Sequence, residues 1–204
     1  MRGKEKLKVA ILASSNKRRH DDEYGCCVAG VTEEGEWIRL VADKCGDSIR
    51  EKDAPKVGKV IAASFEYASF KNQIENAILI DFTPTTEDPK EYVKNIKPVH
   101  EDALFGNKRN FLTKLEIKHC EGSLRRVFVR DLEVYWNETS SCRARFTYQQ
   151  EFYEGIAMTD PKHYTKKGSA PKRIGEAYIV VSLPSDPPYN KFIAAIYPIT
   201  VGHT

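Results

Sequence analysis

The sequence lacks most of the features that identify enzymes, secreted proteins and membrane proteins. It contains no Cys-x-x-Cys pair, glycine-rich phosphate loop, Gly-x-Ser-x-Gly or His-Glu-x-x-His. No apolar run approaches the roughly 20 residues that a membrane-spanning helix needs. The apolar run at residues 9–13 is too short for the core of a signal peptide. We therefore expect a cytoplasmic protein with no membrane partner.

Cysteine and histidine are sparse and scattered. The cysteine count is five, an odd number, and Cys26 and Cys27 are adjacent, so on a strand they point to opposite faces. That placement favours core packing and reduced thiols over a disulfide framework or a metal site. The histidines are His20, His100, His119, His163 and His203, with no spacing typical of metal ligands. We expect no metal, no cofactor and no enzymatic activity.

The net charge of +3 is modest, but the basic residues are clustered. Residues 1–19 carry seven Lys or Arg and a single acid, Glu5. Further basic clusters lie at residues 108–130 and 162–173. Such clusters are what an anionic partner requires, although solvated loops kept basic for solubility have the same composition.

A period of two, with β-branched and aromatic residues at apolar positions, predicts a mainly β protein. The first half offers a turn at Gly35 between two strands, which is a hairpin signal. A long strand before residue 70 is expected to bend near Ala63. The expected strands are residues 7–13, 26–32, 37–42, 59–70 and 77–82 in the first half, and 127–136, 143–149, 152–159, 177–183 and 192–199 in the second.

These segments predict two small barrels in tandem, joined by short helical connections. We place the first barrel at residues 1–84, a linker with a short helix at 85–110, and the second barrel at 111–204. Asp88-Pro89 resembles a helix start, and a helix from residue 89 would end before Pro98.

Several short motifs bracket nearly the whole chain. They are Leu12-Ala13-Ser14-Ser15-Asn16-Lys17, Cys27-Val28-Ala29-Gly30, Trp37-Ile38-Arg39, Thr159-Asp160-Pro161, Ser182-Leu183 and Lys191-Phe192-Ile193-Ala194-Ala195-Ile196. In this order they resemble the dual OB-fold (DuOB) domain family of bacterial proteins. Asn16 departs from the family by replacing a basic residue, and Leu40 by replacing a proline. The resemblance implies two OB-type barrels and recognition of nucleic acid or a nucleotide-like ligand.

OB barrels bind single strands by stacking bases on aromatic side chains while Lys and Arg follow the phosphates. In the first half we predict such contacts from a basic loop at residues 14–25 and from the return strand of the neighbouring hairpin, residues 37–42. Trp37 and Arg39 have the same parity and share a face; if that face were the interior, Trp37 would fill the core instead. The candidate residues are Lys17, Arg18, Arg19, Trp37 and Arg39.

In the second half, parity places Arg143 and Arg145 on the face opposite Phe146, so one face is basic and the other is core. A basic loop follows, in which Lys166 and Lys167 stand beside Gly168. The candidate residues here are Arg143, Arg145, Lys166 and Lys167.

Three functions remain open. The first is a non-enzymatic module that binds RNA or single-stranded nucleic acid. The second is a sensor of a small nucleotide-like ligand in a bacterial defence or regulatory system. The third is a protein-interaction adaptor with an unknown partner. Steep salt dependence favours the first, stabilisation by a mononucleotide the second, and an apolar patch without a basic field the third.

Overall fold

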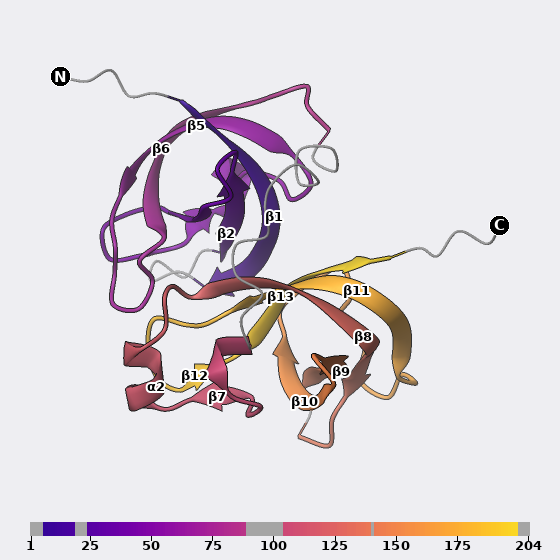
Figure 1. Cartoon of the computed structure of the whole chain (residues 1–204). Helices are drawn as coiled ribbons and strands as arrows, with labels where there is room; N and C mark the ends of the chain where they lie inside the picture. The colour runs from indigo at the N-terminus through magenta and orange to yellow at the C-terminus, as the bar shows by residue number, and fades with distance from the viewer. Residues whose placement is uncertain (1–5, 19–23, 89–103, 140, 200–204) are drawn as a thin grey trace. The chain divides into compact units, whose positions relative to one another are not determined.

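The computed structural model describes residues 6–18, 24–88, 104–139 and 141–199, with only the backbone described at residues 16–18. The chain divides into two compact units (Figure 1). The first comprises residues 1–99 and 121–123, and the second comprises residues 100–120 and 124–204. The predicted helix that starts at Pro89 lies outside the described residues. Each unit is described below by itself.

The first unit is a strongly curved antiparallel sheet with one parallel pairing. Its elements are β1 (Leu7–Arg18), β2 (Tyr24–Thr32), β3 (Trp37–Val41), β4 (Ile49–Arg50), η1 (Glu51–Asp53), β5 (Val60–Tyr67) and β6 (Asn76–Pro84). The pairing order is β1-β5-β6-β3-β2-β4, and β1 also pairs with β2. The strands β1, β2, β3, β6 and β5 therefore form a closed circuit, in which only β3 and β6 run parallel.

The interior of the first unit is filled by alternate residues of these strands. Val9 and Ile11 of β1, Val28 of β2 and Ile38 and Leu40 of β3 are all fully buried in one cluster. Burial of each such side chain contributes about 1.5 to 3 kcal/mol to folding. Because residues 38 and 40 face inward, residues 37 and 39 face outward, which is the parity that the sequence predicts.

The strand β1 is longer than the sequence predicts. Strand pairing continues to Arg18 opposite Tyr24, so residues 14–18 belong to the strand and not to the loop that we expected. A register shift between Ile11 and Ala13 lets the strand bend as it leaves β5. Gly30 faces β1 at close range, since a Cβ atom there would lie 2.4 Å from the Ala10 carbonyl oxygen. That contact explains why the β2 motif ends in glycine.

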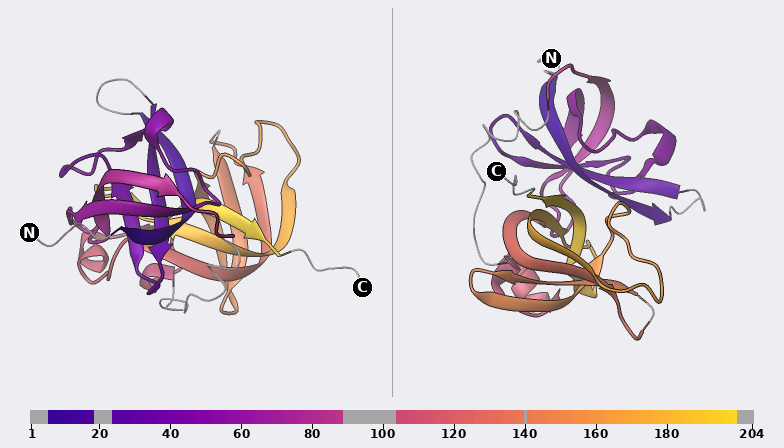
Figure 2. Two further views of the ribbon diagram at one scale, coloured as in Figure 1. Left: turned by 90° about the horizontal axis from the view of Figure 1, so that it is seen from above. Right: turned by 90° about the vertical axis from the view of Figure 1, so that its right-hand side faces the viewer.

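The second unit is a closed barrel in the order β10-β13-β11-β8-β9. Its elements are η2 (Leu104–Gly106), β7 (Phe111–Leu112), α2 (Lys114–Lys118), β8 (Leu124–Trp136), β9 (Cys142–Tyr148), β10 (Glu151–Met158), β11 (Lys172–Ser182), β12 (Tyr189–Asn190) and β13 (Phe192–Pro198). Only β10 and β13 pair in parallel within the barrel. The circuit therefore repeats that of the first unit, and Figure 2 shows its strands curving around the interior.

Two bulges are present in the second barrel. The alternation in β8 changes phase after Val129, and Asp131 there has φ 54° beside a register shift. Gly155 has φ 77° within another shift, between Tyr153 and Ile156. The first unit has a similar shift at Ser64/Phe65, close to the bend expected near Ala63. The predicted fold class, mainly β with two OB-like barrels and short helical connections, is confirmed.

The segment from η2 to α2 packs on the second barrel around a buried lysine. Lys191 is completely buried, and its Nζ donates to the carbonyl oxygen (2.5 Å) and the Oδ1 (3.0 Å) of Asn107. Burial lowers the pKa of Lys191 to about 8. Nearby, α2 begins with a capping box formed by Thr113 and Glu116.

Candidate nucleic-acid interface

The most exposed large aromatic side chains in the described residues include Tyr24, which starts β2 and is 68% exposed. Across β1, β2 and β4, the register aligns Lys17 with Gly25 and Gly25 with Arg50, while Arg18 aligns with Tyr24. This end of the hairpin therefore gathers three basic positions beside one aromatic ring. Arg19 lies outside the described residues.

A shallow surface pocket lies at the same place. It is lined by Tyr24, Arg50, Glu51 and Lys52. Arg50 and Lys52 are both exposed, and Glu51 is the acid among the described residues that line the pocket. The sequence analysis did not select Arg50 or Lys52, because β4 has only two residues and so gives no readable periodicity.

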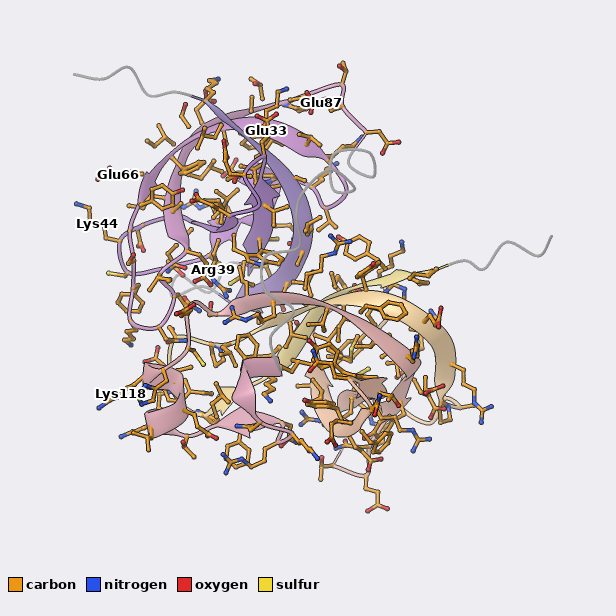
Figure 3. The ribbon with its side chains drawn as sticks, in the orientation of Figure 1. Glu33, Arg39, Lys44, Glu66, Glu87 and Lys118 are labelled. Atoms are coloured by element: carbon orange, nitrogen blue, oxygen red, sulfur yellow. The ribbon has the colours of Figure 1, made fainter. Side chains whose placement is uncertain are left out.

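The outer face of β3 carries Trp37 and Arg39. Trp37 is half-buried and does not belong to the core cluster, so the alternative in which it fills the interior does not describe this fold. Arg39 is only 7% exposed. Figure 3 labels its side chain in the first unit. A nucleic-acid contact through Trp37 thus stays a prediction that the geometry permits.

Arg39 belongs to a buried polar cluster within the first unit. Its Nη2 donates to the Ser123 hydroxyl at 2.6 Å and lies 3.5 Å from Glu75 Oε1. Glu75 in turn accepts from the Ser123 backbone N–H at 3.1 Å and from its hydroxyl. All three residues are buried, so the guanidinium is committed to this cluster. A phosphate contact by Arg39 would require the cluster to open.

In the second barrel, β9 presents a basic face as the alternation predicts. Ala144, Phe146 and Tyr148 are buried, whereas Arg143 and Arg145 point outward. Arg145 donates to Glu133 at 2.5 Å, approaches Glu154 at 3.6 Å and lies over the Tyr135 ring. Its hydrogen bond with Glu133 raises the pKa of Arg145 further. Acids therefore offset much of the charge on this face.

The loop between β10 and β11 exposes Lys166 and Lys167. Two contacts anchor its earlier part near the start of β9: Thr165 Oγ1 lies 3.4 Å from Cys142 Sγ, and the Tyr164 and Trp136 rings meet edge to face at 5.9 Å. The structure thus brings these lysines toward the end of β9 that carries Arg143. Arg143 itself donates from Nε to Ser141 at 3.1 Å.

The only buried histidine among the described residues has a structural position. His163 Nδ1 lies 2.8 Å from Asp160 Oδ2, and the same carboxylate accepts from the Ile196 backbone N–H at 2.9 Å. Asp160 therefore ties its loop to β13, which explains the Thr159-Asp160-Pro161 motif. In residues 6–18, 24–88, 104–139 and 141–199, no group of three His, Cys, Asp or Glu side chains could hold a metal ion. The expected absence of metal and of catalysis stays a prediction.

The helices in the described part of the chain are all too short or too polar to cross a membrane. The candidate basic positions described above lie at the end of the β1–β2 hairpin in the first unit, and on β9 and the loop that approaches it in the second.

Comparison with known proteins places this chain by its fold family. No curated protein matches it. A solved structure titled "Structural mimicry for functional antagonism" aligns over 94% of this chain and 89% of that chain, with 11% identity and a TM-score of 0.32. The family model for the dual OB-containing domain matches residues 7–197, nearly the whole chain. The chain therefore belongs to the dual OB-containing domain (DuOB) family, as its motifs predicted.

Proposed function

We propose that this chain is a non-enzymatic module of the bacterial cytoplasm that binds RNA or another single-stranded nucleic acid. The observation that carries the proposal is the end of the β1–β2 hairpin. There the backbone register pairs Lys17 with Gly25 and Arg18 with Tyr24, pairs Gly25 with Arg50, and leaves the Tyr24 ring exposed. A stacking ring among cations is the combination that single strands require, because the bases stack while the phosphates need positive charge.

The fold supports the same location. OB barrels bind oligonucleotides on the face of their second and third strands and through the loops beside it, including the loop between the first two strands. In the first barrel that loop joins β1 to β2. Trp37 lies on the outer face of β3, opposite Val31 at the far end of β2 from Tyr24, and is a separate candidate stacking position.

The second barrel supplies a weaker basic face. Arg143, Lys166 and Lys167 lie on β9 and the loop that approaches it, while Arg145 is held by Glu133. We propose that these residues add phosphate contacts and that the hairpin end of the first barrel provides the larger share of affinity.

Fluorescence polarisation with a labelled oligouridine of about 20 nucleotides tests this proposal. Neutralising about four phosphates gives a log–log salt slope of about −3 for a single strand. The double substitution Lys17→Ala, Arg18→Ala should weaken binding to every sequence alike and flatten the slope to about −1.5.

The matched control is Lys6→Ala, Lys8→Ala, which removes the same charge from the other end of β1. Lys6 and Lys8 pair with Asp81 and Glu87 at 2.8 and 2.5 Å. If both double variants weaken binding equally, the hairpin end is not the site. If no nucleic acid binds at low salt but a mononucleotide raises the melting temperature, the chain is a small-ligand sensor instead. Degradation of the oligonucleotide by pure protein would contradict a purely binding role.

A further inference from the structure

An aromatic row crosses three neighbouring strands of the second barrel. Phe128 on β8 pairs with Tyr178 on β11, and Tyr178 pairs with Tyr197 on β13. The residues on either side, such as Val127 and Ile179, belong to the core, so the three rings lie on the outer face. Tyr178 is 38% exposed, and its ring centroid lies 5.6 Å from that of Phe128.

Two arginines cover these rings. The Arg126 guanidinium lies 4.4 Å from the centre of the Tyr178 ring, and that of Arg130 lies 5.7 Å from the centre of the Phe128 ring. Arg130 also approaches Glu176 at 3.5 Å. Stacking fixes the plane of a guanidinium while leaving its N–H edge available for further hydrogen bonds.

Arg126 differs from the other arginines described above in its partners. Within the described residues it has no carboxylate at salt-bridge distance and no hydrogen-bond acceptor, although it is half-buried. Burial lowers the pKa of its guanidinium. A cation that has lost part of its hydration without gaining an acid favours an incoming anion, because the anion restores the missing hydrogen bonds.

We propose that this arginine–aromatic face, formed by Arg126, Phe128, Arg130, Tyr178 and Tyr197, is a second contact surface for single-stranded nucleic acid. Arg126 binds a phosphate through its free N–H edge, and a neighbouring base stacks on the exposed part of the Tyr178 and Phe128 pair. The inference rests on the proposed function. It adds a site on strands β8, β11 and β13, away from the β9 face that the basic alternation predicts.

The charge and the aromatic rings of this face together favour single-stranded nucleic acid as its ligand. The face carries two arginines and one acid, Glu176, so its net charge is positive. The ring surface that the guanidinium groups leave uncovered can stack on a nucleobase, whereas an acidic peptide would need only the charge. Single-stranded nucleic acid uses both features.

The experiment combines affinity with the position of contact. Labelled oligouridine is titrated against wild type, Arg126→Gln, Tyr178→Leu and Tyr178→Phe. Arg126→Gln should weaken binding about tenfold, because it removes a charge-assisted contact. Tyr178→Leu should weaken it about fivefold or more by removing a stacking surface, while Tyr178→Phe, which keeps the ring, should bind within about twofold of wild type.

Photocrosslinking with 4-thiouridine oligonucleotides provides an independent readout. Crosslinked peptides should include β8 or β11, and the crosslink should be lost in Tyr178→Leu. The matched control is Lys118→Gln, which removes one positive charge from an exposed side chain on α2 of the same unit. Melting temperatures of all variants check that the barrel remains folded.

The two proposals fail in different ways. If the wild type binds no nucleic acid, the proposed function and this inference both fall. If the wild type binds and Lys17→Ala, Arg18→Ala weakens it, but Arg126→Gln and Tyr178→Leu bind normally and no crosslink falls on β8, β11 or β13, only this inference is overturned.

Discussion

The two barrels share one pairing circuit but differ in how their buried and half-buried cations are paired. In the first barrel, Arg39 is matched by Glu75 and Ser123 within a closed cluster. In the second, Lys191 is buried against the oxygens of Asn107, and Arg126 lies over a ring without an acid among the described residues. The first barrel therefore holds a cation that is paired with an acid, whereas the second holds cations without such a partner among the described residues. A paired cation supports the fold, whereas an uncompensated one costs stability or attracts an anion.

The largest expected effect is at Arg39. Arg39→Met should lower the free energy of unfolding by about 3 to 5 kcal/mol, because among the described residues it leaves the buried Glu75 carboxylate with Ser123 alone as a partner. Urea unfolding at neutral pH measures this change. Binding of oligouridine by the folded fraction should change far less.

A double variant separates lost pairing from lost packing. Adding Glu75→Gln to Arg39→Met removes the orphaned charge and should restore a large part of the stability. If Arg39→Met unfolds normally but binds nucleic acid weakly, then Arg39 contacts the ligand, and the cluster does not have the structural role assigned to it.

Lys191 should show the opposite behaviour, because among the described residues no acid lies at hydrogen-bond distance from its ammonium group. Its pKa falls from 10.5 to about 8 on folding, so the unfolded chain binds more protons between these values. Stability should therefore rise with pH across that window. The rise from about pH 7 to pH 10 should be about 2 to 3 kcal/mol larger in wild type than in Lys191→Met.

Comparison with the variant matters because other groups titrate in this range. Burial also raises the pKa of Tyr153, and a tyrosine charges as pH rises. Both proteins contain Tyr153, so the difference between their curves isolates Lys191. Parallel curves for wild type and Lys191→Met would show that Lys191 stays charged in the native state.

Local periodicity predicted most of the fold. The strict alternation of β9 predicted which of its residues are buried and which form its basic face, because one residue in two must face the interior. The change of phase in β8 after Val129 coincides with the bulge at Asp131. The extension of β1 to Arg18 was missed because residues 14–18 are polar, and their strand conformation depends on pairing with β2 across the hairpin.

The candidate site was only partly predictable for a related reason. A sequence gives the parity of a residue but not its partner. Arg39 has the expected outward parity, yet its guanidinium is bound by Glu75 and Ser123, which are distant in sequence. Conversely, Arg126 and Tyr178 lie on separate strands, and only the register of β8 and β11 brings them together. The signal available in the sequence was the aromatic residues at outward positions between core residues, such as Tyr178 between Ala177 and Ile179.

The smallest expected effect concerns Glu116, which lies beside the uncompensated Lys191 but is itself well paired. Its carboxylate accepts from the Thr113 backbone N–H at 2.8 Å, and from Asn107 and Arg109 at 2.9 and 2.5 Å. Led by the Thr113 bond, these contacts lower the pKa of Glu116 from 4.5 to about 2. The stability that they provide is complete above about pH 4.5 and is lost as pH falls toward 2.

Glu116→Gln keeps an oxygen for the capping box but has no charge, so its melting temperature should fall less steeply over that window. Glu138→Gln, at an exposed turn of the same unit, is the control and should follow wild type. If Glu116→Gln and wild type lose stability in parallel below pH 4.5, the α2 capping box does not depend on the carboxylate, and the contrast between paired and unpaired charge in this barrel disappears.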